Sequence, residues 1–143
     1  MADPLFCAWR FTHPDFRLYE KTVGLSVDRS GRIAMVDDNA SVRQAILLLL
    51  TTMPGERVMR PRYGCDLHRL VFSPNDATSH GLAMHYVRTA ISRWEPRVNI
   101  IRLDARCDET NTAKMLIELD YLVRRTAHRD TLLIPFDLEQ ETP

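Results

Sequence analysis

The sequence predicts an α+β fold in which an antiparallel β-sheet has helices packed on one face. Apolar residues recur at helical spacing in two segments, and after Pro96 apolar and polar residues alternate in three short segments. Helices that precede a run of strands favour an antiparallel sheet over alternating parallel units. With 143 residues, of which 45% are hydrophobic and 27% charged, the chain is long enough to bury a core without disulfides or a metal.

Residues 1–23 are expected to form an N-terminal arm ahead of a single domain at residues 24–143. The arm is rich in aromatic residues, contains two prolines and shows neither helical nor strand periodicity. We therefore expect it to pack on the domain or on a partner. At the start of the domain, two short apolar segments flank a polar turn at residues 28–31, which predicts a hairpin over residues 25–36.

The first helix should begin near Asp38, Asn39 or Ser41, because each of these side chains can act as an N-cap. It should run to about Thr52. Its leucine-rich run at residues 46–50 is apolar on all sides, so this helix is expected to be largely buried.

The second and longest helix is expected at residues 76–94, and Pro96 ends it. A short helix capped by Asp66 should precede it. The residues of the long helix that should face the core recur at helical spacing: Leu82, Ala83, Tyr86, Val87, Ala90, Ile91 and Trp94.

Three strands are predicted after the long helix. The first covers residues 101–107, and a slip in its alternation at Ile100 indicates a β-bulge. A polar turn joins it to the second strand at residues 115–123. The third strand covers residues 132–138 and contains Pro135, which cannot donate a ladder hydrogen bond and therefore favours the edge of the sheet.

Charge and cysteine content narrow the function classes. The 19 basic and 19 acidic residues cancel, so bulk electrostatics give no support to a nucleic-acid or membrane partner. Cys7, Cys65 and Cys107 are odd in number and far apart. That pattern argues against a disulfide framework or a zinc site and favours a reducing cytoplasm. We expect no cofactor.

Residues 54–64, here called the arginine loop, contain two prolines, two glycines and three arginines. Pro61 fixes its own φ and biases the residue before it towards extended geometry, while the glycines permit turns. The segment therefore predicts a stiff, exposed loop that presents Arg57, Arg60 and Arg62 to carboxylates or phosphates.

Two further elements are candidate docking sites. Glu95-Pro96-Arg97 places an acid and a base on either side of a proline where the long helix ends. It is either a helix stop with a local ion pair or a docking element whose rigid backbone lowers the entropy lost on binding. The edge strand could accept a strand from a partner, or the N-terminal arm could cover it.

No catalytic motif emerges from the sequence. His80 and His85 are five residues apart, which does not place both on one helical face as metal ligands, and there is no H-E-x-x-H or G-x-S-x-G. Glu56 with Asp66 or Glu95 could be imagined as the carboxylate pair of a glycosidase. A chain of this size supplies such pairs by chance.

Several motifs together resemble the gene-25-type baseplate wedge family of contractile phage tails, whose type VI secretion counterpart is TssE. The resemblance covers roughly residues 24–138. The matching segments are Gly31 to Val36, Ser41 to Gln44, Pro54 to Pro61, Tyr63 to Leu67, Arg93 to Arg97 and Arg129 to Phe136.

The resemblance implies a structural subunit and not an enzyme, with a sheet similar to the interlocking domain of sheath subunits. Such proteins lie in the inner baseplate near the hub and tube, in six copies, and seed the first ring of sheath. Glu95, Pro96 and Arg97 would dock on the core bundle formed by other wedge proteins. The edge strand would accept an extended arm of a first-ring sheath subunit.

The sequence therefore predicts a baseplate component, cytoplasmic during assembly, with a small cell-wall muramidase as the rival and an adaptor for an acidic partner as a third reading. Residues 95–97 are called the helix stop below. The residues expected to bind partners come from the arginine loop, the helix stop and the edge strand: Glu56, Arg57, Arg60, Arg62, Glu95, Pro96, Arg97, Leu132, Leu133 and Ile134.

Overall fold

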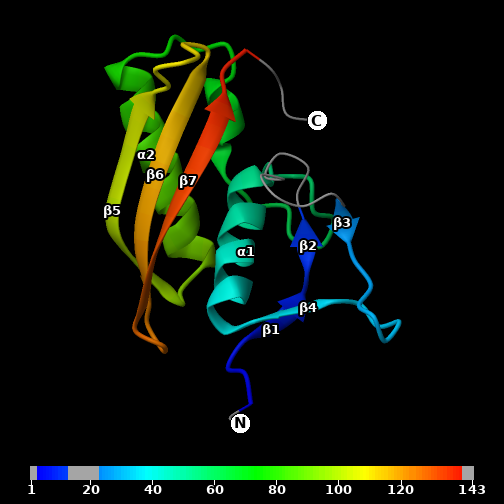
Figure 1. Cartoon of the computed structure of the whole chain (residues 1–143). Helices are drawn as coiled ribbons and strands as arrows, with labels where there is room; N and C mark the ends of the chain where they lie inside the picture. Colours follow the sequence, from blue (N-terminus) through cyan, green and yellow to red (C-terminus); the bar gives the residue numbers. More distant parts are fainter. Residues whose placement is uncertain (1–2, 13–22, 140–143) are drawn as a thin grey trace. The chain divides into compact units, whose positions relative to one another are not determined.

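The computed structural model describes residues 3–12 and 23–139. The chain divides into two compact units, residues 1–48 and residues 49–143 (Figure 1). The expected division into an arm at residues 1–23 and one domain after it stays a prediction.

The first unit contains two small antiparallel sheets. β1 (Cys7–Trp9) pairs with β4 (Met35–Asp37), and β2 (Phe11–Thr12) pairs with β3 (Gly24–Leu25). The described part of the predicted arm thus packs on its own chain, and residues 13–22 lie outside the described residues.

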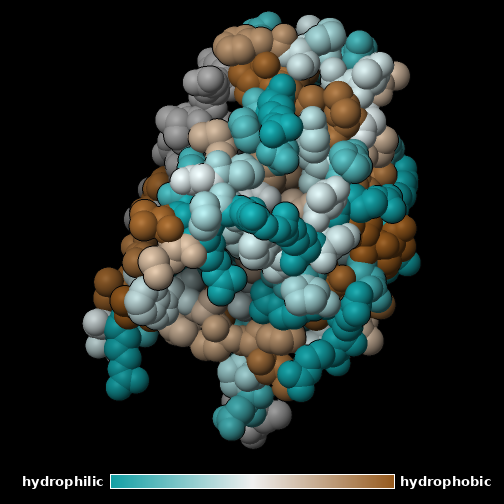
Figure 2. Space-filling view, turned by 180° about the vertical axis from the view of Figure 1, so that it is seen from behind, coloured by the Kyte–Doolittle hydropathy of each residue, from teal (hydrophilic) through white to brown (hydrophobic). Residues whose placement is uncertain are grey.

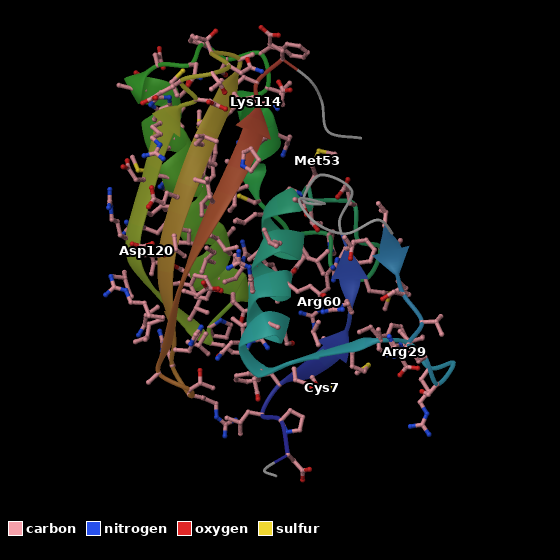
Figure 3. The ribbon with its side chains drawn as sticks, viewed as in Figure 1. Cys7, Arg29, Met53, Arg60, Lys114 and Asp120 are labelled. Atoms are coloured by element: carbon pink, nitrogen blue, oxygen red, sulfur yellow. The ribbon has the colours of Figure 1, made fainter. Side chains whose placement is uncertain are left out.

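The predicted hairpin over residues 25–36 is present but short. Val27 and Ile33 form a single antiparallel bridge, and the flanking strands pair with the N-terminal segment and not with each other. Asp28 orders the turn, because its carboxylate accepts hydrogen bonds from the backbone N–H groups of Ser30 and Arg32 at 2.8 and 3.0 Å. Arg29 lies in this turn (Figure 3).

One face of these small sheets is apolar and largely exposed. Cross-strand pairing and the two-residue repeat of a strand bring the side chains to the same face. The residues on it are Trp9, Phe11, Leu25, Val27, Ile33 and Met35. Val36 alternates with them and is buried.

α1 (Asp38–Thr51) confirms the first predicted helix. Val42, Ile46 and Leu49 are at most 1% exposed, as its apolar run predicts. The helix begins at Asp38 and contains Asn39 and Ser41, so the expectation that one of these three is its N-cap is wrong. The Asp38 carboxylate accepts a hydrogen bond from the backbone N–H of Leu5 at 2.7 Å and so ties the N-terminal segment to the start of the helix.

The second unit begins its regular structure with a short 3₁₀ helix, η2 (Asp66–Leu70). Asp66 is the first residue of this helix and not its cap, so that expectation is also wrong. Cys65 occupies the cap position without a side-chain hydrogen bond, because a buried thiol replaces the usual hydroxyl or carboxylate there.

α2 (Ala77–Trp94) matches the predicted long helix. The carboxylate of Asp76 caps it by accepting the N–H of Ser79 at 2.9 Å, and this hydrogen bond lowers the pKa of Asp76. Ala83, Val87, Ala90 and Ile91 are buried as expected.

Leu82 was expected to face the core, but its side chain is 41% exposed. Successive helical residues are rotated by about 100°, so Leu82 lies outside the stripe that contains Ala83 and Val87. The expectation was wrong because an apolar residue beside the stripe cannot be distinguished from one within it by composition alone.

The three predicted strands form one antiparallel sheet in the order β5-β6-β7 (Figure 1). They are β5 (Val98–Cys107), β6 (Lys114–Val123) and β7 (His128–Asp137). The pairing of β5 with β6 shifts between Ile100 and Arg102, which confirms the bulge. α2 packs on one face of the sheet, against β5 and β6. Among residues 3–12 and 23–139, β7 pairs only with β6 and is an edge strand, as Pro135 predicts.

Candidate functional site

The arginine loop is a chain of tight turns. The backbone N–H of Arg60 donates to the carbonyl of Arg57 at 3.1 Å, and that of Tyr63 donates to the carbonyl of Arg60 at 3.0 Å. A hydrogen bond of 2.9 Å from the N–H of Cys65 to the carbonyl of Thr52 closes the base of the loop. The expectation of an exposed loop is confirmed, because the residues from Pro54 to Arg62 are all exposed, and its stiffness stays a prediction.

Glu56 holds the start of the loop and does not project from it as a free ligand. Its carboxylate accepts the backbone N–H of Met53 at 2.9 Å. Met53 and Arg60 can be located in Figure 3. Gly64 allows the loop to close: its φ is +136°, and a Cβ there would clash with the carbonyl oxygen of Thr52.

Tyr63 connects the loop to the end of α2. The guanidinium carbon of Arg57 lies 4.3 Å from the centre of the Tyr63 ring, within cation–π distance. The same ring meets Trp94 edge to face, with 5.4 Å between the ring centres. Burial raises the pKa of the Tyr63 hydroxyl, so it stays neutral and available as a hydrogen-bond donor.

Glu95 and Arg97 form a two-pronged ion pair beside this stack. Arg97 donates from Nε and Nη2 to the two carboxylate oxygens of Glu95 at 2.5 and 2.7 Å. The side chain of Glu95 is 7% exposed and that of Arg97 is 31% exposed. The hydrogen bonds to Glu95 raise the pKa of Arg97 above its ordinary value. Pro96, between them, is exposed.

The structure therefore brings together the arginine loop and the helix stop, which are about 30 residues apart in the sequence. The Glu95 carboxylate is bound within the chain, so it positions Arg97 and Pro96 and is not itself displayed. A sequence with two aromatic residues at positions 63 and 94 gives no signal that they will meet. Their contact depends on how the loop folds back on α2.

The three residues of the edge strand that were expected to bind a partner lie on opposite faces of the sheet. Leu132 and Ile134 are 2% and 3% exposed, so their side chains belong to the core, whereas that of Leu133 is 49% exposed. β5 and β7 are opposite edges of the sheet. Because Arg97 directly precedes β5, the helix stop and the exposed edge at Leu133 lie at opposite edges.

Sequence reasoning missed the two most exposed apolar residues of the loop, Val58 and Met59, at 93% and 91% exposure. Across the face seen in Figure 2, apolar surface occurs in separate areas divided by hydrophilic side chains. The signal that could have found the pair is an apolar dipeptide in a segment otherwise composed of turn formers and arginines.

A cleft of about 140 Å³ lies between the loop and α2, lined by Arg62, Asp66, His85 and Arg93 among others. Cys65 lines it too, and burial raises the pKa of its thiol to about 11, so it is a poor nucleophile at neutral pH. Over residues 3–12 and 23–139, no group of three or more His, Cys, Asp or Glu side chains could hold a metal ion. Over the same residues, no helix is long and apolar enough to cross a membrane.

Solved structures similar to this chain include a crystal structure and several baseplates. A Geobacter sulfurreducens protein described as a candidate tail lysozyme is 38% identical, with a TM-score of 0.67 over 76% of this chain and 100% of its own. A chain of the anti-feeding prophage baseplate is 16% identical, with a TM-score of 0.59 over 94% of this chain and 88% of its own. A chain of the type VI secretion system baseplate is 18% identical, with a TM-score of 0.53 over 71% of this chain and 93% of its own.

The sequence itself matches a family model. No curated protein matches the chain. The model of the baseplate wedge protein gp25 matches residues 36–128, which include α1, the arginine loop, the Glu95–Arg97 pair and the paired strands β5 and β6. This chain therefore belongs to the gp25 family of baseplate wedge proteins.

Proposed function

We propose that this chain is a structural subunit of the baseplate of a contractile tail or injection particle. It docks on the core bundle of the wedge, near the hub and tube, and templates the first ring of sheath. The observation that carries the proposal is the pair of surfaces at opposite edges of one sheet. They are the helix stop before β5 and the outer edge of β7, which pairs with no further strand among the described residues. Six copies fit the sixfold symmetry applied to the similar anti-feeding prophage baseplate.

The docking surface consists of the exposed ring of Pro96, the partly exposed guanidinium of Arg97 and the cationic arginine loop beside them. Glu95 fixes Arg97 through two charge-assisted hydrogen bonds, and Glu56 fixes the loop. Side chains and backbone that are already ordered lose less entropy on binding. Pro96 and the arginines Arg57, Arg60, Arg62 and Arg97 are then the groups that the partner contacts.

The templating surface is the free edge of β7. Along an antiparallel ladder, hydrogen-bonded and non-hydrogen-bonded pairs alternate. Leu138 donates to Ala113 at 2.9 Å, immediately beyond the pair of Lys114 with Asp137, so even-numbered residues of β7 bond to β6. Odd-numbered residues then direct their backbone groups to the free edge, which agrees with the position of Pro135.

In the middle of this edge, Leu133 is the outward residue whose N–H is open to a new strand. Pro135 has no N–H, and the N–H of Thr131 donates to the Asp130 carboxylate at 2.8 Å. No hydrogen bond to the backbone of Leu133 is found among the described residues. An edge interrupted at Thr131 and Pro135 resists indiscriminate pairing while keeping the backbone of Leu133 for a specific strand.

A test of templating substitutes Leu133 in the subunit of the assembling particle. Leu133→Pro removes the outward N–H and spares the bonds to β6, so the subunit should fold while baseplates fail to initiate sheath. Leu133→Ala, which keeps the N–H, is the matched control and should assemble sheath. Full-length sheath on Leu133→Pro baseplates in electron micrographs would rule out strand addition at this position.

A test of docking replaces Glu95 and Arg97 together by Ala. The control is the double replacement of Arg102 and Asp104, an exposed ion pair with the same spacing in β5. The first variant should lose incorporation into baseplates, and the control should keep it. Equal incorporation of the two variants would contradict a docking role for the helix stop.

A second candidate function is a small muramidase, favoured by one observation: the 38% identical Geobacter protein is described as a candidate tail lysozyme. In this chain the carboxylates considered for that role are otherwise engaged, Glu95 with Arg97, Glu56 with the Met53 N–H, and Asp66 with Arg69 at 3.5 Å. Peptidoglycan turnover by the purified chain that is lost in Glu56→Gln would establish hydrolysis in place of a purely structural role.

A further inference from the structure

The tip of the arginine loop carries an apolar pair that turn formation does not explain. The hydrogen bond from the N–H of Arg60 to the carbonyl of Arg57 makes Val58 and Met59 the two central residues of a β-turn. Those positions favour Pro, Gly, Asn, Asp or Ser, and a β-branched or long apolar residue gains nothing there. A local choice that conflicts with the structure it occupies points to function.

Both side chains lie almost fully in solvent, with Val58 at 93% and Met59 at 91% exposure. Single exposed apolar residues are common and need no explanation. Here two adjacent ones are held outward by a loop whose ends are fixed. The hydrogen bond from the N–H of Cys65 to the carbonyl of Thr52 closes the base of the loop. The ring of Tyr63 holds the second half of the loop against Trp94.

The charged residues on either side of the apolar pair are arginines. Arg57, Arg60 and Arg62 flank the apolar pair and are exposed. Among the described residues, no carboxylate forms an ion pair with any of the three, and the nearby Glu56 carboxylate accepts a backbone N–H. The complement of this surface is an apolar pocket bordered by carboxylates.

We propose that the Arg57–Arg60 turn is an anchor that inserts Val58 and Met59 into an apolar, acid-rimmed pocket on another subunit of the particle. Only the identity of that subunit as a baseplate protein rests on the proposed function. Methionine adapts to irregular pockets, and the preformed turn limits the entropy lost on insertion. Arginine desolvates more readily than lysine, which favours a protein pocket over a lipid surface.

The anchor is tested with two variants that separate its apolar and charged parts. The serine variant, Val58→Ser with Met59→Ser, removes the apolar tip and keeps the arginines. The glutamine variant, Arg60→Gln with Arg62→Gln, removes two of the positive charges and keeps the apolar tip. Because all four side chains are exposed, both variants should melt like the wild type. Incorporation into purified particles should fall about tenfold or more for the serine variant, from the apolar area no longer buried. The glutamine variant should be incorporated less than the wild type at low salt, and this difference should vanish at high salt because salt screens the charges.

A photoreactive benzoylphenylalanine at position 59 identifies the pocket, with the same group at the exposed helix position Arg88 as control. Cross-linking from position 59 to an acidic, apolar segment of one baseplate subunit supports the anchor. Wild-type incorporation of the serine variant overturns it, as does cross-linking no different from that of the control. Sedimentation of the wild type, but not the serine variant, with phosphatidylglycerol vesicles would assign the tip to a membrane surface instead. Sheath initiation by Leu133→Pro baseplates reports on the templating proposal separately.

Discussion

The ring of Tyr63 lies edge to face against that of Trp94, with 5.4 Å between their centres and an angle of 61° between their planes. This contact joins the last part of the arginine loop to the last turn of α2. The Glu95–Arg97 pair follows Trp94 directly, so the same contact sets the position of the loop relative to the helix stop. Loss of the Tyr63 ring should therefore affect both.

Tyr63→Ala should lower the free energy of unfolding by about 2 kcal/mol, because it removes a half-buried ring and its aromatic contact. Tyr63→Phe keeps both and should cost less than about 1 kcal/mol. Urea denaturation of the two variants measures the difference. Equal destabilisation by Ala and Phe would mean that the hydroxyl, and not the ring, holds the loop.

Gly64→Ala should be strongly destabilising, by about 3 kcal/mol or more, since a Cβ at this positive φ would meet the backbone of Thr52 and lie 2.9 Å from the carbonyl carbon of Met53. Gly55→Ala is the matched control. Gly55 also has a positive φ, +98°, but its Cβ would meet nothing within 4 Å. Its cost should be about 1 kcal/mol. Equal stability of the two variants in thermal unfolding would contradict the close contact between Gly64 and the backbone of residues 52–54.

A double-mutant cycle on Glu95 and Arg97 should give a coupling free energy of about 1–3 kcal/mol, because the pair is two-pronged and the Glu95 carboxylate is nearly buried. The exposed Arg102–Asp104 pair, at 3.4 Å, should give about 0.5 kcal/mol or less. Both couplings come from urea denaturation of the single and double alanine variants. A coupling near zero for Glu95 and Arg97 would show that the ion pair does not hold Arg97 in place for docking.

Stability should decrease in alkali because of Cys65. Burial raises the pKa of its thiol from 9.0 to about 11, so between these pH values the unfolded chain loses a proton that the folded chain keeps. This contribution is present below pH 9 and lost as the pH rises to about 11, up to about 2 to 3 kcal/mol. The readout is the difference in unfolding free energy between wild type and Cys65→Ala across this range. A difference that does not change with pH would show that Cys65 is not protected.

Local patterns predicted the regular elements well. The alternation in residues 115–123 and the helical spacing around Val87 are signals contained within a few turns or strand residues, and β6 and α2 lie where these signals indicate. Pro135 predicted the edge of the sheet because a missing N–H has the same consequence in any sheet. The slip at Ile100 predicted the bulge for a similar reason.

The errors at Leu82 and Asp66 were local, whereas other errors and omissions arose from interactions between residues far apart in sequence. Asp38 can cap a helix by type, but the N–H of Leu5, 33 residues earlier, takes its carboxylate. The meeting of Tyr63 with Trp94 is likewise invisible in either segment alone. Glu95 and Arg97 could be predicted as a pair from their spacing, whereas the burial of Glu95 could not.

The most direct measurement of the central claim is a cryo-electron microscopy map of purified particles at a resolution that traces β-strands. The account predicts this chain in the baseplate, in sixfold repetition, with a fourth strand from a first-ring sheath subunit hydrogen-bonded to β7 at Leu133. A β7 edge that is bare or covered by residues 1–23 of the same chain would contradict templating. Absence of the chain from the particle would contradict the account as a whole.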